Sequence, residues 1–227
     1  DRITRPEQII QSFPNAVQTM LDPADCGPAC ISLCQDIQGQ SFDYPEEFFI
    51  EKIHSIRRPR PDDFQIKEAA EKIKNSKNPI IISGGGVFYS NAMEELSNFA
   101  IKHNIPVTQT VMGYSTMKRD HSHYAGQIGG LGGKNTNDLA KETDLAIAVG
   151  TKLADFTTGS WANFENENFK LLSINVSRFD ANKHLAQAVV GDAKVSLIEL
   201  SKALGDWKVG DEWNQKSQRE LKIWNEH

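Results

Sequence analysis

Three consecutive glycines at the end of a short apolar run constrain the fold of this chain more than any other feature. Ile80–Ile82 follows Pro79 and leads through one serine into Gly84–Gly86. A β-branched run between proline and glycine is typical of a parallel strand buried on both faces. We expect the glycines to turn the backbone tightly with positive φ. Asn91, with Glu94 three positions later, is predicted to cap the next helix. Open α/β sheets bind ligands at such turns.

Further apolar segments predict the rest of a sheet. Their positions are residues 105–111, 144–151, 170–176 and 188–191. Helical periodicity lies between most of them, and Asp192 is predicted to cap the last helix. Strands that alternate with helices predict right-handed crossovers and a parallel sheet covered on both faces. The sequence therefore predicts a three-layer, doubly wound, Rossmann-like α/β fold. Residues 112–133, dense in glycine from Gly126 onward, are predicted to form a long functional loop.

Composition excludes several classes of protein. The 227 residues carry a formal net charge of -5, so no strongly basic surface is available for nucleic acid. No apolar run approaches the roughly 20 residues that a membrane-spanning helix needs. The first residues do not have the pattern of a secretory signal peptide. Three cysteines cannot all pair with one another, which favours a reducing cytoplasm.

The ends of the chain differ from its middle. Residues 1–45 predict one helix and one strand, the strand over residues 29–37, and these cannot close a core alone. We interpret residues 1–45 as the end of another domain and residues 46–61 as a linker. Residues 62–205 then form the central domain. Residues 206–227 are interpreted as the start of a linker or of a third domain.

The ends of the predicted strands form a candidate nucleotide crevice, which we interpret as vestigial. It comprises Gly84, Gly85, Gly86, Gly150, Thr151 and Asn175. The glycines resemble the start of a dinucleotide fingerprint, but Tyr89 occupies the position of its last glycine. The second strand ends in Gln109-Thr110 without an acid that could bind a ribose hydroxyl. A structural turn is therefore favoured over a working nucleotide site.

No catalytic or metal-binding residue is predicted. His121 and His123 have no further ligand cluster near them in sequence, so a metal site is disfavoured. Asp155 and Asp180 are isolated carboxylates without an evident partner. The sequence contains no nucleophile elbow, phosphate-binding P-loop or zinc signature.

Several stretches resemble the thiamine-diphosphate enzymes. Residues 27–37, from Gly27-Pro28 to Asp36-Ile37, are similar to the closing strand of that family's pyrimidine-binding domain. The pattern of residues 79–85, 140–150 and 171–176, together with Gly191-Asp192-Ala193, is similar to its central domain. Residues 35–45, 155–160 and 175–184 resemble one branch, which opens the ring of a cyclic 1,2-dione in myo-inositol breakdown. The resemblance implies that the intact protein is a cytoplasmic hydrolase of carbohydrate metabolism that breaks a carbon–carbon bond in a small ketonic substrate.

The resemblance also implies a division of labour between domains. Thiamine diphosphate and magnesium would be bound by domains absent from this chain. The family's activating glutamate would lie upstream of Asp1, and its Gly-Asp-Gly metal motif would lie in a third domain. The Gly-Asp pairs of this chain end in Asp192, Asp206 and Asp211, and none continues to glycine. We therefore expect this chain alone to be inactive and free of cofactor, and the intact enzyme to be a homo-oligomer.

Two alternatives remain open. The chain could be the FAD- or ADP-binding central domain of an enzyme that resembles acetohydroxyacid synthase, a lyase or transferase, with the glycines serving a phosphate. It could also be a sirtuin-like NAD-binding domain, which shares the sheet topology. Such a domain would need a catalytic histidine, which we cannot assign.

Overall fold

The computed structural model describes residues 1–226 and divides the chain into two compact units. The first unit comprises Asp1–Arg57, and the second begins at Arg58. The predicted domain limits at residues 45, 61 and 205 stay predictions.

The first unit contains little regular structure. Its elements are β1 (Arg2–Ile3), η1 (Pro6–Gln8), α1 (Ile9–Leu21), β2 (Ser32–Leu33), α2 (Gln35–Gln38) and η2 (Glu46–Phe49). Strands β1 and β2 pair in parallel over two residues each. Ile3 and Ser12 are the buried side chains of this unit. The unit therefore has almost no core of its own.

The strand predicted over residues 29–37 was largely wrong. Only Ser32–Leu33 is extended and paired, and helix α2 begins at Gln35. The alternating apolar pattern fits a strand, but β1 offers only two residues for it to pair with. An apolar pattern forms a strand only where a neighbouring strand can complete its hydrogen bonds.

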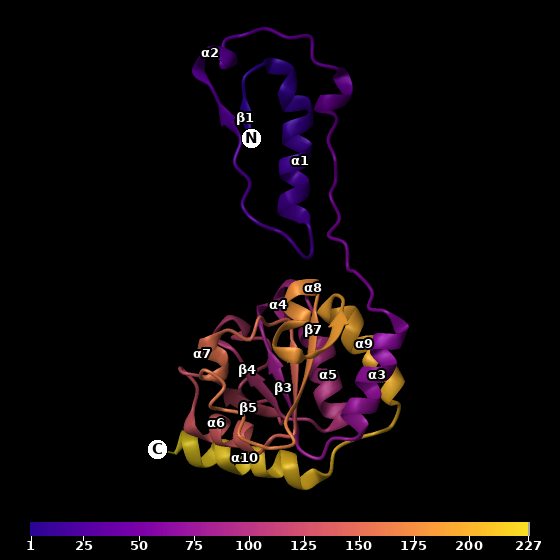
Figure 1. Ribbon diagram of the computed structural model, residues 1–227, viewed down its shortest axis with the longest axis vertical. Coiled ribbons are helices and arrows are strands. Elements are labelled where there is room, and N and C mark those ends of the chain that lie inside the picture. Colours follow the sequence, from indigo (N-terminus) through magenta and orange to yellow (C-terminus); the bar gives the residue numbers. More distant parts are fainter. Residues whose placement is uncertain (227) are drawn as a thin grey trace. The chain divides into compact units, whose positions relative to one another are not determined.

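The second unit is a three-layer α/β domain (Figure 1). Its strands are β3 (Pro79–Ser83), β4 (Val107–Gln109), β5 (Tyr124–Gln127), β6 (Leu145–Val149), β7 (Lys170–Asn175) and β8 (Gln187–Val190). Its helices are α3 (Asp63–Lys74), α4 (Gly85–Tyr89), α5 (Met93–His103), η3 (Val111–Gly113), α6 (Lys134–Glu142), α7 (Asp155–Thr158), α8 (Arg178–Ala181), η4 (Lys183–Leu185), α9 (Ala193–Leu204) and α10 (Asp211–Asn225).

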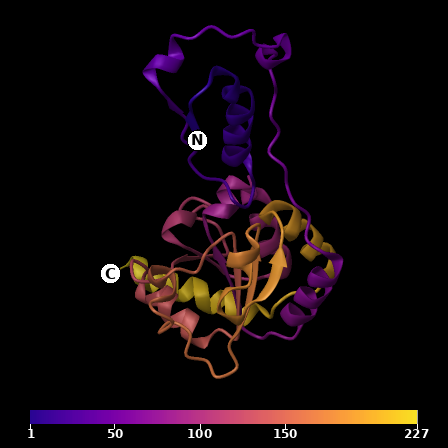
Figure 2. The same ribbon diagram turned by 45° about the horizontal axis from the view of Figure 1, so that its top comes forward.

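All six strands of this domain are parallel, in the order β5-β4-β3-β6-β7-β8. The predicted doubly wound parallel sheet is confirmed. Strand β3 lies between β4 and β6, and Ile81 pairs with Val107 on one side and with Ile147 on the other. Helix α9 packs against α3 and α5 on one face of the sheet, and α6 packs against α10 on the other (Figures 1 and 2). Both faces are therefore covered, as the continuous apolar strands require.

Strand β5 was missed by the sequence analysis. It lies inside residues 112–133, which were predicted to be a loop. Its third residue, Gly126, has φ 110°, and its pairing with β4 is irregular between Val107 and Thr108. A short edge strand that contains a left-handed glycine does not show a regular apolar pattern.

The helix cap predicted at Asn91 was also wrong. Asn91 adopts φ 51° between α4 and α5, and Ala92 is the residue that precedes α5. Asparagine tolerates this left-handed conformation better than most residues. Asn91 thus contributes to the turn between α4 and α5 through its backbone, and not to a helix cap through its side chain.

Helix α10 completes the face of the sheet that α6 covers. Its buried residues are Trp213, Ser217 and Leu221. The indole nitrogen of Trp213 donates to the carbonyl of Pro79, at the start of the central strand, over 2.8 Å. Among residues 1–226, no helix is both long enough and apolar enough to cross a membrane.

Asp192 fixes the start of α9, as predicted. One carboxylate oxygen accepts hydrogen bonds from the backbone nitrogens of Lys194 and Val195 at 3.0 and 3.2 Å. The other lies 3.0 Å from the guanidinium of Arg58. The Asp192 side chain is only 6% exposed, so these partners replace the water that it loses on folding.

We expect Asp192→Ala to lower the free energy of unfolding by about 1–2 kcal/mol, because it removes a helix cap and leaves Arg58 without its partner. Asp206→Ala is the matched control, since Asp206 also follows a glycine but is exposed. Urea denaturation followed by circular dichroism measures both variants. Equal losses in the two variants would contradict this role for Asp192.

Candidate functional site

The predicted crevice lies where β3, β6 and β7 end. These neighbouring parallel strands bring Gly84–Gly86, Gly150 with Thr151, and Asn175 to one edge of the sheet. Gly84 donates its backbone N–H to Val149, and Gly86 donates to Gly150, both over 2.9 Å. The turns after β3 and β6 are therefore joined directly through their backbones.

Glycine is required at positions 84 and 86 because the backbone of Gly150 approaches them closely. A Cβ atom on Gly84 would lie 2.4 Å from the carbonyl oxygen of Gly150, and one on Gly86 would lie 2.6 Å from the Cα of Gly150. The positive φ predicted for Gly84–Gly86 was wrong, because Gly84 has φ -110° and the left-handed residue is Gly150, with φ 59°. Gly85 lies apart from this contact, since its Cβ would meet the carbonyl oxygen of Met112 at 3.1 Å.

The polar groups of the crevice bind one another. The side-chain nitrogen of Asn175 donates to the carbonyl of Thr151 over 3.2 Å, and its oxygen accepts from the backbone nitrogen of Ser177 over 3.0 Å. The Thr151 hydroxyl accepts from the backbone nitrogen of Leu153 over 3.3 Å. These groups therefore serve to hold the turns after β6 and β7.

The segment after β4 covers the end of β3. The hydroxyls of Ser83 and Thr116 lie 2.7 Å apart, and the side-chain nitrogen of Gln109 donates to the carbonyl of Met117 over 2.9 Å. A Cβ on Gly113 would lie 2.1 Å from the carbonyl oxygen of Ser83. This part of the predicted loop is thus packed tightly on the sheet.

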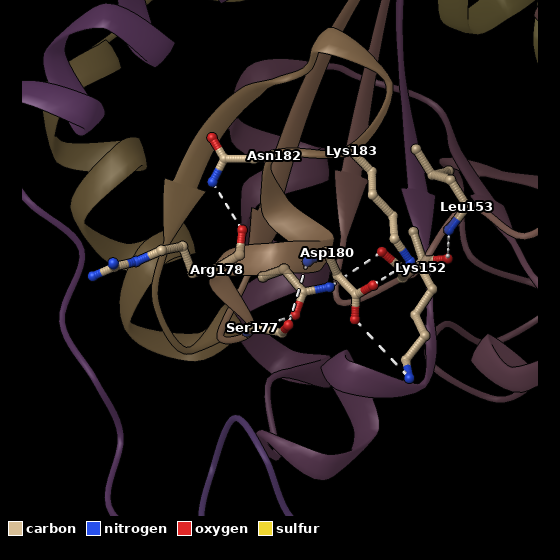
Figure 3. A network of polar contacts seen from close by, with 9 residues as sticks. Lys152, Leu153, Ser177, Arg178, Asp180, Asn182 and Lys183 are labelled. Atoms are coloured by element: carbon tan, nitrogen blue, oxygen red, sulfur yellow. Dashed lines mark hydrogen bonds and ion pairs between the residues drawn. The ribbon is translucent and has the colours of Figure 1, made fainter.

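An ion-pair network lies beside the turn after β6 (Figure 3). The carboxylate of Asp180 is 2.5 Å from the ammonium of Lys183 and 4.0 Å from that of Lys152. The Asp180 side chain is 9% exposed and lies in α8. The prediction that Asp180 has no partner was wrong. Lys183, three residues later, was a signal that could have revealed the pair.

The two predicted loop histidines are held by hydrogen bonds. The Nε2 of His123 lies 3.0 Å from the side-chain oxygen of Asn104, and that of His121 lies 2.8 Å from the Ser97 hydroxyl. Burial and the neighbouring His121 lower the pKa of His123 from its ordinary 6.5 to about 4. Burial also lowers the pKa of His121. A neutral His123 donates its Nε2 proton to Asn104, whose side-chain nitrogen donates to the carbonyl of Val209.

No metal site is evident in the part of the chain that the structure describes. Within it, no three His, Cys, Asp or Glu side chains gather closely enough to hold a metal ion.

Comparison with protein families gives one match to this domain. Residues 66–200 match the family described as the central domain of thiamine pyrophosphate enzymes. Thiamine pyrophosphate is another name for thiamine diphosphate. The match spans α3 to most of α9 and includes every strand of the six-stranded sheet.

Two curated relatives carry the same name. The chain is 42% identical over 226 residues to the 3D-(3,5/4)-trihydroxycyclohexane-1,2-dione hydrolase of Clostridium perfringens, covering 100% of this chain and 35% of that protein. It is 40% identical over 232 residues to the hydrolase of the same name from Bacillus subtilis, covering 98% of this chain and 36% of that protein. The chain therefore spans about a third of the length of these relatives.

A solved structure shares the fold at lower identity. The benzoylformate decarboxylase of Polynucleobacter necessarius superimposes with a TM-score of 0.74 and 22% sequence identity. The match covers 93% of this chain and 39% of that chain. Identity this low supports the fold alone.

Gly86→Ala is expected to destabilise the domain by about 1–3 kcal/mol, because the added methyl group would overlap the Cα of Gly150 in a packed backbone contact. Gly85→Ala, in the same turn, is the control, and its loss should be smaller because its nearest contact is 3.1 Å away. Thermal unfolding compares the two variants. A larger loss for Gly85→Ala would refute this account of the turn.

Stability should fall as the pH drops from 6.5 toward about 4. In this range the unfolded chain binds a proton at His123 and the folded chain does not, so acid favours unfolding. His123→Gln removes this titration and should flatten the pH dependence of the melting temperature. His54→Gln is the control at an exposed histidine of the first unit. An unchanged slope in His123→Gln would show that other groups cause the dependence.

Proposed function

This chain belongs to the thiamine pyrophosphate enzymes, as one of their central domains, and we propose that the intact protein hydrolyses a trihydroxycyclohexane-1,2-dione during myo-inositol degradation. The observation that carries the proposal is the 40% and 42% identity, over nearly all of this chain, to hydrolases named for that substrate. The reaction would add water and break a carbon–carbon bond of the cyclic dione, which opens its ring.

Thiamine diphosphate with magnesium would supply the electron sink for this cleavage when bound. The described residues do not fit this group. Asp192 binds a helix N-terminus and Arg58, and Asp211 accepts from Asn104 over 3.0 Å. Two of the chain's three Gly-Asp pairs are thus committed to structural contacts. We therefore assign the cofactor and the metal to other domains of the intact protein, and assign no catalytic residue to this chain.

The role of this chain would be to hold those domains. A parallel sheet covered on both faces is a rigid support, and rigid supports position catalytic groups more precisely than loops do. We further propose that the intact enzyme is a cytoplasmic homo-oligomer. Cys26, Cys30 and Cys34 are free in the structure, which suits a reducing compartment.

A nucleotide-binding central domain is the alternative, with FAD, ADP or NAD as the ligand. The glycine turn after β3 favours it, since such turns approach phosphates closely. The carbonyl of Gly150 and the amide of Asn175, however, already bind protein groups at this edge. The names of the relatives also favour the hydrolase over an acetohydroxyacid synthase or a sirtuin-like protein.

We expect the full-length protein to consume the cyclic dione only when thiamine diphosphate and magnesium are present. The 227-residue chain alone should show no turnover, and its melting temperature should not change with thiamine diphosphate and magnesium, FAD, ADP or NAD. Dione consumption is measured in the first experiment and thermal unfolding in the second.

Each part of the proposal can fail separately. If the full-length protein is inactive on the dione, the substrate assignment is wrong. Saturable binding of thiamine diphosphate by the short chain would overturn the division between domains. A reproducible rise in melting temperature with a nucleotide would favour the alternative.

A further inference from the structure

Strand β8 is an edge strand of the six-stranded sheet. It pairs with β7 on one side, and no other strand of the described residues pairs with its free side. Residues 185–191 contain no charged side chain and include two adjacent valines. Edge strands with uncharged, β-branched sequences readily pair with strands of other chains. The free side of β8 therefore needs protection if separate copies of the chain are to stay apart.

The direction of the backbone shows which groups of β8 an added strand would bind. The amide of Gly191, just after the strand, donates to the carbonyl of Asn175 in β7 over 3.0 Å. Successive residues of a strand direct their N–H and C=O groups to opposite sides. Ala188, Val190 and Asp192 therefore direct their backbone groups to the free side.

Two of these three amides already have acceptors within the domain. Val190 donates to the side-chain oxygen of Gln65, in α3, over 2.9 Å. Asp192 donates to the carbonyl of Pro59 over 2.8 Å. We call residues 58–61 together with the Gln65 side chain the edge cover. The edge cover takes up the hydrogen bonds that an added strand would form at the carboxyl end of β8.

Charged side chains fix the edge cover to the domain. The guanidinium of Arg58 lies 3.0 Å from the carboxylate of Asp192. The guanidinium of Arg60 lies 2.8 Å from the carboxylate of Glu199, in α9. Each ion pair joins the edge cover to α9 or to the residue that caps it. The segment therefore has an anchor on either side of Pro59.

The prolines of the edge cover suit a segment that covers a sheet without extending it. Pro61 is buried, and a Cβ atom on Gly191 would lie 2.9 Å from its Cδ. Proline has no backbone N–H, so a segment with prolines at positions 59 and 61 cannot form a regular ladder. The structure accordingly has no strand in residues 51–62. The sheet thus ends at β8 and its cover.

We propose that the edge cover is an autoinhibitory contact that prevents a second copy of this chain from pairing with β8. In a two-fold antiparallel pair, the N–H and C=O groups of Ala188 would bind those of Val190 in the second copy, and the reverse pair would form as well. A second copy is favoured over an unrelated strand because these positions are complementary to themselves and carry small or β-branched side chains without charge. This contact is independent of the dione reaction.

Removing two contacts of the edge cover should allow β8 to pair. Gln65→Ala frees the amide of Val190, and Arg58→Ala removes an ion pair beside Pro59. In this double variant of the 227-residue chain, hydrogen exchange at residues 187–190 should become slower as the protein concentration rises, because pairing between copies protects the amides. In the unchanged chain the exchange rate of these residues should not depend on concentration. Mass spectrometry of the exchanged peptides measures both.

Two further variants make the test specific. Arg57→Ala with Lys67→Ala is the matched control, because both side chains are exposed and neither forms a hydrogen bond or ion pair with β8 in the described structure. It should behave as the unchanged chain does. Ala188→Pro, added to the first double variant, removes an amide that pairing needs but that faces away from β7, and it should abolish the dependence on concentration. Circular dichroism establishes that each variant is folded.

Each remaining outcome decides against the edge cover as an inhibitor of pairing. Exchange at β8 that is independent of concentration in the folded double variant would show that the cover has no such role. A dependence already present in the unchanged chain would show that the cover leaves the edge open. A dependence that survives Ala188→Pro would place the contact between copies elsewhere. If the double variant does not fold, Gln65→Ala alone, which leaves both ion pairs in place, is measured in the same way and decides between the same outcomes.

Discussion

The fold depends on one direct backbone contact, between the glycines of the turn after β3 and the glycine of the turn after β6. Gly84 and Gly86 lie so close to Gly150 that no Cβ fits between them. The hydrogen bonds from Gly84 and Gly86 to the strand and turn of β6 continue the pairing of β3 with β6 beyond the sheet. The chain reverses its winding direction at β3, because β4 lies on one side of it and β6 on the other. The contact therefore sets the spacing of both halves of the sheet at the point where they meet.

Much of this architecture could be predicted from the sequence because its strands are buried on both faces. Continuous apolar runs such as Ile80–Ile82 have few other interpretations when helical patterns lie between them. Strand β5 was not predicted because it is short, lies at the edge of the sheet and contains Gly126 in a left-handed conformation. The strand expected over residues 29–37 failed for the opposite reason. Its pattern was right, but the neighbouring strand that would complete it is only two residues long.

The location of the candidate site was easier to predict than the contacts that its residues make. The rule that parallel strands end at one edge placed Gly84–Gly86, Gly150 and Asn175 together, and the structure shows them together. Sequence spacing could not show that Gly150 approaches Gly84 and Gly86 through its backbone. It also could not show that the side-chain nitrogen of Asn175 donates a hydrogen bond to the carbonyl of Thr151. Both facts depend on distances across strands, which a one-dimensional pattern does not contain.

The hydrogen bond between Trp213 and Pro79 shows that the packed domain extends beyond the residues of the family match. The family match ends at residue 200, yet the buried Trp213 donates its indole N–H to the carbonyl of Pro79, the first residue of the central strand. The segment that the family match covers is therefore shorter than the packed domain, whereas the curated relatives match nearly the whole chain. A boundary drawn at the end of the family match would cut through a packed interface and leave the carbonyl of Pro79 without its donor. For this protein, the segment after α9 belongs to the physical domain whatever its evolutionary origin.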